Sequence, residues 1–214
     1  MTVGLAVALA ALSASTASWQ ARAVIRETSS PARLPEGVAS YAALTALATL
    51  VLAVRLPAGA GLAAVLLTIG GVPLAIIDAR THRLPDSLTG LTSVAVAAAL
   101  IATAVVTHSA TRLSAAAVGA AAMAGFYALL LVASATLGSA AAYGIGDVKL
   151  ALSVGAVLGS LGPLPWFAGL LGAHLLYLAV HASRAAGGHS GWRTRHAFGP
   201  PMLTAAALAA VLLG

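Results

Sequence analysis

The chain has 214 residues, of which 60% are hydrophobic and only 7% are charged, and its mean hydropathy is +1.00. Because soluble domains carry roughly 25% charged residues, this composition excludes an ordinary soluble protein. The absence of cysteine excludes a disulfide framework and a cysteine-ligated zinc site. The net charge of +6 is explained by basic residues flanking membrane spans, so we expect a lipid bilayer and no nucleic acid as partner.

Long apolar segments follow one another along the whole chain. They lie at about 2–19, 38–54, 57–77, 87–106, 114–137, 148–161, 164–182 and 198–213. This pattern predicts an all-α, polytopic transmembrane helical bundle with about eight spans, within a range of roughly six to eight. The range reflects a first segment rich in Ser and Ala and a short, glycine-rich sixth segment. A membrane β-barrel would instead require alternating polarity.

Basic residues accumulate on alternate connections between these segments. One set holds nine of the eleven Lys and Arg residues: Arg22, Arg26, Arg33, Arg80, Arg83, Lys149, Arg184, Arg193 and Arg195. The other set holds only Arg55 and Arg112. Since cytoplasmic loops are enriched in Lys and Arg, the first set is predicted to be cytoplasmic, with both termini on the other side.

Two of the five acidic residues stand where apolar segments meet this cytoplasmic boundary. Asp78 ends the apolar run "GVPLAIID", and Asp147 opens the segment "GIGDVKLALSVG". Ionisable groups at membrane depth are costly and indicate function. Two carboxyl groups at one depth suit an aspartic protease, in which one group takes a proton from water and the other hydrogen-bonds the scissile carbonyl.

The residues around Asp147 allow two interpretations. Gly144 and Gly146 leave a bare backbone that can adopt positive φ and let an extended substrate approach closely. Alternatively, the glycines only begin a helix that Asp147 caps. Lys149 is expected to pair with a carboxylate or a lipid phosphate, or to extend along the interface, and a role in substrate binding is included in the prediction.

Asp86 is a third candidate carboxylate. It follows Pro85 and precedes the apolar segment 87–106, so it is interpreted mainly as a helix N-cap and only secondarily as catalytic. The six histidines are scattered, which predicts no metal site.

Three stretches together resemble the prepilin peptidases, or type IV leader peptidases, which are membrane aspartic proteases of the Gly-x-Gly-Asp class. These stretches are "IDARTHRLPDSLT", "YGIGDVKL" and "HAFGPPMLTAA". The resemblance divides the chain into N-terminal spans with a cytoplasmic loop (1–55) and a peptidase-like core (56–214). It implies that Asp78 and Asp147 are the catalytic pair and that no cofactor is needed.

The resemblance also implies a substrate and a location. The expected substrate is a prepilin or pseudopilin precursor with a basic leader, cleaved at the cytoplasmic face of the inner (plasma) membrane. The chain lacks the cysteine-bearing part that the family links to N-methylation, so peptidase activity without methyltransferase activity is expected. A proton- or cation-coupled transporter and a non-enzymatic pilus or secretion assembly factor remain alternatives.

Overall fold

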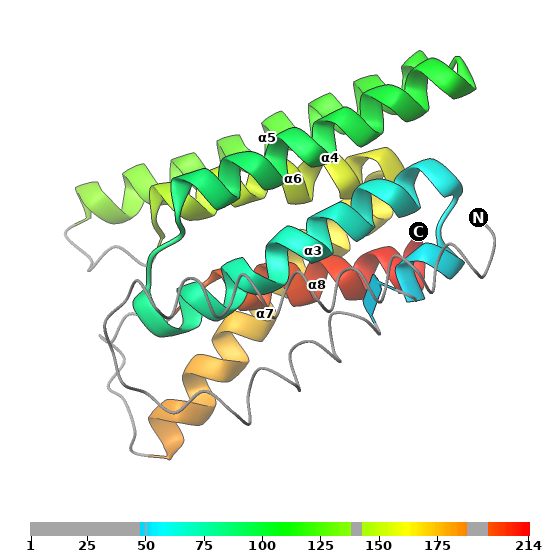
Figure 1. The fold of residues 1–214 in the computed structure, drawn as a ribbon. Helices are drawn as coiled ribbons and strands as arrows, with labels where there is room; N and C mark the ends of the chain where they lie inside the picture. The colour runs from blue at the N-terminus through cyan, green and yellow to red at the C-terminus, as the bar shows by residue number, and fades with distance from the viewer. Residues whose placement is uncertain (1–47, 50, 138–142, 188–196) are drawn as a thin grey trace.

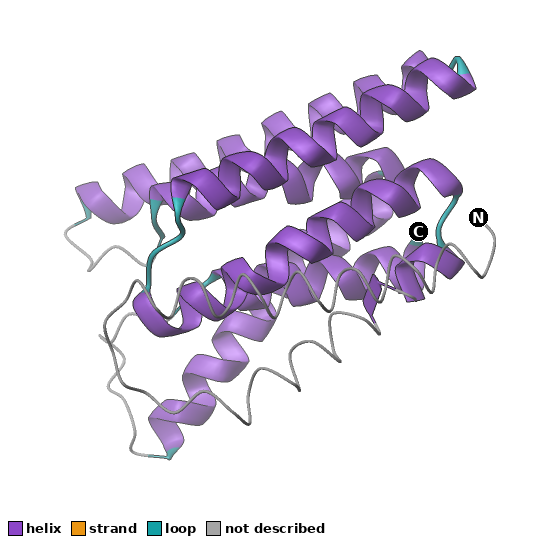
Figure 2. Ribbon diagram, in the orientation of Figure 1, coloured by secondary structure: helices purple, strands orange, loops and turns teal. Residues whose placement is uncertain are grey.

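The computed structural model describes residues 48–49, 51–137, 143–187 and 197–214, and all regular secondary structure in these ranges is helical (Figure 2). A short helical stretch at 48–49 and 51–55 leads into six longer helices. These are α3 (Ala58–Thr81), α4 (Asp86–Thr107), α5 (Ala110–Thr136), α6 (Ile145–Leu161), α7 (Pro163–Ala186) and α8 (Gly199–Leu213).

The predicted all-α class is confirmed for the part of the chain that the structure describes. Helices α3 to α8 coincide with the last six predicted segments to within about one helical turn. Among the described residues, four helical ranges are long and apolar enough to cross a membrane: Gly59–Ala79, Asp86–Thr107, Ala110–Thr136 and Pro163–Ser183. The first segment and most of the second fall outside the described residues, so the total of about eight spans stays a prediction.

Helix α6 is the centre of the bundle. It packs against each of α3, α4, α5, α7 and α8. Helix α7 is inclined to the other helices and packs mainly on α8 (Figure 1). Nine of its 17 residues are buried, among them Leu150, Val154 and Leu158. Because protein surrounds α6, its small residues serve helix packing, which explains why the sixth segment is rich in glycine.

Consecutive helices run in opposite directions, so each end of the bundle gathers the starts of some helices and the ends of others (Figure 1). The last turn of α3 and the first turns of α4, α6 and α8 meet at one end. We call it the aspartate end, because Asp78 lies in the last turn of α3 and Asp147 in the first turn of α6.

The contact between α5 and α6 depends on three glycines. A methyl group added at Gly119 would lie 2.5 Å from the carbonyl oxygen of Gly155 and 2.8 Å from the Cα of Gly159. A methyl group at Gly155 or Gly159 would likewise overlap the backbone of α5. The two helix backbones therefore touch, as small residues allow in membrane bundles.

This contact predicts that Gly155→Ala destabilises the protein by about 1–3 kcal/mol, because the added methyl group forces the two backbones apart. Gly125→Ala is the matched control, since no atom lies within 4 Å of a methyl group added there. Thermal unfolding in detergent measures both variants. Equal melting temperatures for Gly155→Ala and Gly125→Ala would contradict the close packing of α5 on α6.

Candidate active site

Asp78 is buried and is held by the start of another helix. Only 6% of the surface of Asp78 is exposed to solvent. The backbone N–H of Gly199, the first residue of α8, donates a 2.8 Å hydrogen bond to Oδ2 of Asp78. A methyl group at position 199 would lie 2.9 Å from the same oxygen. The stretch "FGPP" thus places a residue without a side chain where the carboxylate needs a backbone donor.

Asp147 is buried in a similar way at the start of α6. It is 8% exposed, and the backbone N–H of Gly144 donates a 2.8 Å hydrogen bond to its Oδ2. The backbone N–H of Asp147 in turn donates to the carbonyl oxygen of Gly144 at 3.1 Å. Asp147 therefore closes the first turn of its own helix, where the helix dipole also favours a negative charge.

The structure brings these two carboxyl groups together. Although α3 and α6 are far apart in the sequence, Asp78 and Asp147 interact electrostatically. Each carboxyl group uses Oδ2 for its backbone donor, and Oδ1 of each has no hydrogen bond to any residue that the structure describes. Oδ1 of each carboxyl group thus remains available to water or a substrate.

The glycines around Asp147 lie at the start of α6. Gly144 has an extended backbone with φ −115° and ψ 166°, and Gly146 lies within the first turn of α6. Neither glycine uses the positive φ that a bare backbone allows, and this geometry agrees with the alternative interpretation, in which the glycines begin a helix that Asp147 caps. A methyl group at Gly146 would lie 2.8 Å from Cβ of Leu84, so this glycine lets the α3–α4 connection pack on α6. Substrate binding along Gly144 and Gly146 stays a prediction.

Asp86 does not form the predicted side-chain cap. Pro85 occupies the N-cap position of α4, Asp86 is the first helical residue, and no side-chain cap hydrogen bond is formed. The carboxylate instead accepts a 2.7 Å hydrogen bond from Nζ of Lys149, which draws it across to α6. The expected pairing of Lys149 with a carboxylate is confirmed, whereas its role in substrate binding stays a prediction.

A cluster of rings lies beside the carboxyl pair, and sequence reasoning gave it no role. Phe198 contacts the rings of Tyr127, Tyr143, His174 and Tyr177, with centroids 5.1 to 5.4 Å apart. The three tyrosines also interact electrostatically with Asp147. Aromatic residues make up only 5% of the chain, and three of its four tyrosines lie in this cluster. No local sequence motif predicts this concentration of rings.

Two polar atoms of this cluster are buried without a partner among the described residues: the Tyr127 hydroxyl and His174 Nε2. Nδ1 of His174 lies 2.8 Å from the carbonyl oxygen of Leu170, so Nδ1 is the donor in this hydrogen bond. The described residues contain no group of three or more His, Asp or Glu side chains that could hold a metal ion.

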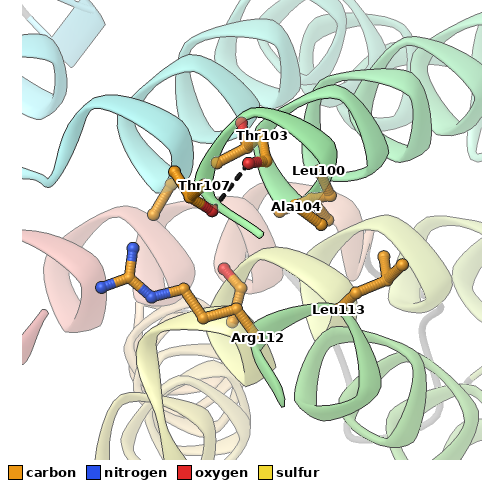
Figure 3. A pocket seen from close by; sticks show the side chains of 8 residues that line it. Leu100, Thr103, Ala104, Thr107, Arg112 and Leu113 are labelled. Carbon is orange, nitrogen blue, oxygen red and sulfur yellow. Dashed lines mark hydrogen bonds between the residues drawn. The ribbon is translucent and has the colours of Figure 1, made fainter. Parts of the chain in front are cut away.

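A hollow lies at the opposite end of the bundle (Figure 3). Its Thr107 hydroxyl donates to the carbonyl oxygen of Thr103, and its Ser160 hydroxyl donates to that of Val157. These hydroxyls are therefore engaged within their own helices. It contains no carboxylate, and its lining residues are Ala60, Leu100, Thr103, Ala104, Thr107, Arg112, Leu113 and Ser160. The hollow therefore lacks the carboxyl groups that lie at the aspartate end.

The exposed ion pair predicts a small, charge-dependent effect on stability. Asp86→Asn keeps an acceptor for Lys149 and should leave the melting temperature nearly unchanged. Asp86→Lys places two cations together and should cost about 0.2–1 kcal/mol, because exposed pairs contribute this much. The double variant Asp86→Lys with Lys149→Glu should recover the loss in thermal unfolding at low salt. Equal stability of the Asp86→Lys single and double variants would show that the pair is not formed.

Comparison with known proteins gives one result that bears on this site. Neither the curated proteins nor the solved structures contain a significant match to the chain. The profile of the type IV leader peptidase family, peptidase family A24, matches residues 64–214, which include α4 to α8, most of α3 and both buried aspartates. A match over well over half of the chain, containing all three motif stretches, shows that the chain belongs to the type IV leader peptidase family.

Proposed function

We propose that this protein is a membrane-embedded aspartic endopeptidase that removes the basic leader peptide of prepilin-like proteins, with Asp78 and Asp147 as its catalytic residues. The observation that carries the proposal is the pair of buried, interacting carboxyl groups, each held by a backbone N–H through one oxygen. Membership of the type IV leader peptidase family supports the substrate class.

The arrangement suits peptide hydrolysis by general acid–base catalysis. Two buried carboxyl groups that interact do not both ionise cheaply, so the pair shares a proton. The ionised carboxylate takes a proton from water as the water oxygen attacks the scissile carbonyl carbon. The protonated carboxyl group hydrogen-bonds the carbonyl oxygen and stabilises the tetrahedral intermediate. The leaving nitrogen then takes up a proton from the pair, the C–N bond breaks, and a carboxylic acid and an amine are released.

The position of the pair favours a peptidase over a proton or cation path. Groups that relay ions through a bundle usually lie near mid-membrane on discontinuous helices. Asp78 and Asp147 instead lie at the ends of continuous helices, where a peptide can reach them from the membrane surface. An assembly factor without catalysis would have no need for two buried carboxyl groups held in one site.

Replacing either aspartate by asparagine, in Asp78→Asn or Asp147→Asn, should abolish cleavage while the protein still accumulates. The amide oxygen of the new side chain can still accept the backbone hydrogen bond, so folding is preserved, but the ionisable group is lost. The double variant should be no worse than either single one, because groups that act as a unit do not contribute additively. Wild-type activity should show a bell-shaped pH profile that belongs to the pair.

The assay follows conversion of a pilin precursor to its shorter form by gel electrophoresis, with detergent-solubilised protein. Asp86→Asn is the matched control, since Asp86 is an exposed carboxylate outside the buried pair. Processing at near wild-type rate by Asp78→Asn or Asp147→Asn would refute the aspartic mechanism. Loss of processing in Asp86→Asn at normal abundance would bring Asp86 into the site.

The proposed orientation places the aspartate end in the cytoplasm, on the basis of the distribution of Lys and Arg. A fused reporter that is active only in the cytoplasm should therefore be active after Arg83 or Arg195. A fused reporter that is active only outside the cytoplasm should be active after Arg112. Arg83 lies before α4 and Arg112 lies in the first turn of α5, so one helix separates them. Finding both positions on the same side would contradict the membrane-spanning role of α4.

A further inference from the structure

The two backbone donors that hold the carboxyl pair share a local sequence. Gly144, which donates to Asp147, follows Tyr143, and Gly199, which donates to Asp78, follows Phe198. The N–H group of each glycine belongs to the planar peptide unit that also contains the carbonyl group of the preceding aromatic residue. The position of each donor is thus tied directly to the position of an aromatic residue.

These two aromatic residues contact each other. The rings of Tyr143 and Phe198 meet edge to face, with centroids 5.1 Å apart and planes at 67°. This is the shortest of the ring contacts that Phe198 makes in the described part of the chain. It joins Tyr143, two residues before α6, to Phe198, the residue directly before α8. The contact therefore links the two peptide units that hold the carboxyl groups.

Neighbouring helices fix one side of this contact. Phe198 is 2% exposed and also meets the rings of Tyr127 on α5 and of His174 and Tyr177 on α7. Tyr143 is only half-buried but touches Tyr127 and His174 as well. Edge-to-face ring contacts have a preferred geometry, so they set relative position as well as adding stability.

We propose that the contact between Tyr143 and Phe198 sets the spacing of the two backbone donors and thereby the relative position of Asp78 and Asp147. Tyr143 and Phe198 are positioning residues in this proposal, since they act on the carboxyl groups through Gly144 and Gly199. The inference rests on the proposed peptidase function. It concerns how the pair is held rather than which groups react.

The test compares ring-removing variants with ring-keeping ones in the precursor cleavage assay. Tyr143→Leu and Phe198→Leu should each lower kcat about 10- to 100-fold with little change in KM, because small misplacements of reacting groups have large effects on rate. Tyr143→Phe keeps the ring contact and should restore a kcat close to that of the wild type. The double variant Tyr143→Leu with Phe198→Leu should be no slower than the slower single variant, since both remove one contact.

Phe126→Leu is the matched control. Phe126 belongs to the same group of rings, contacting Tyr127 and His174, but it precedes no glycine that holds a carboxylate. Its replacement should leave kcat unchanged. Effects common to all leucine variants would indicate general loosening of the rings and would overturn the proposal.

The pH profile separates positioning from loss of stability. A changed spacing of the pair should move the limbs of the profile in Tyr143→Leu and Phe198→Leu but not in Phe126→Leu. Among the described residues, the other titratable groups that face the pair are Tyr127 on α5, Tyr177 on α7, Tyr143 itself and His82 beside Asp78. Phe198→Leu retains all of them, and Tyr143→Leu removes only Tyr143. A lower melting temperature with an unmoved pH profile would overturn the proposal.

Two further outcomes keep the inference distinct from the proposed function. If Asp78→Asn and Asp147→Asn remain active, the peptidase mechanism fails, whatever the ring variants do. If the aspartate variants are inactive and Tyr143→Leu behaves as the wild type, only the positioning role fails. Should Phe198→Leu not accumulate, Tyr143→Leu and Tyr143→Phe decide the question, because the half-buried Tyr143 tolerates replacement more readily.

Discussion

The structure depends on one constraint: a carboxyl group buried in an apolar bundle must receive a hydrogen bond to remain there. Asp78 and Asp147 are both buried, and each receives one from a backbone N–H. Asp147 receives its hydrogen bond from Gly144 within the start of its own helix, whereas Asp78 receives its hydrogen bond from Gly199 at the start of α8. The burial of Asp78 therefore requires that the start of α8 be brought to the last turn of α3. The packing of the bundle serves this requirement.

Several contacts of small residues bring the helices together around the two buried carboxyl groups. The backbone contact of α5 with α6 at Gly119 and Gly155 fixes the central helix that carries Asp147. Gly146 admits Leu84, so the connection that follows Asp78 packs on the first turn of α6. The Asp86–Lys149 ion pair joins α4 to the same turn of α6, although an exposed pair of this kind contributes little to stability. Shape complementarity, rather than charge, thus holds the site together.

The sequence was sufficient for what depends on composition and on periodic runs of apolar residues. Helices α3 to α8 follow from hydropathy, and the placement of Asp78 and Asp147 at the same end of the bundle follows from hydropathy and from the charges at segment ends. What depends on three-dimensional packing was not predictable. The N-cap assigned to Asp86 was wrong because Pro85 occupies that position, and the carboxylate pairs instead with Lys149, which is distant in sequence. The ring cluster around Phe198 draws its members from separate segments, and no local pattern connects them.

The location of the pair at one end of the bundle follows from backbone chemistry. Within a helix every N–H is already bonded to a carbonyl group, so only the first turn of a helix has N–H groups to offer. A bundle poor in polar side chains can therefore supply backbone donors to buried carboxyl groups only where helices begin. Gly144 and Gly199 stand at such places. In the proposed peptidase these ends face the membrane surface, where water and an extended peptide are available, so the requirement that buries the carboxyl groups is compatible with hydrolysis at that place.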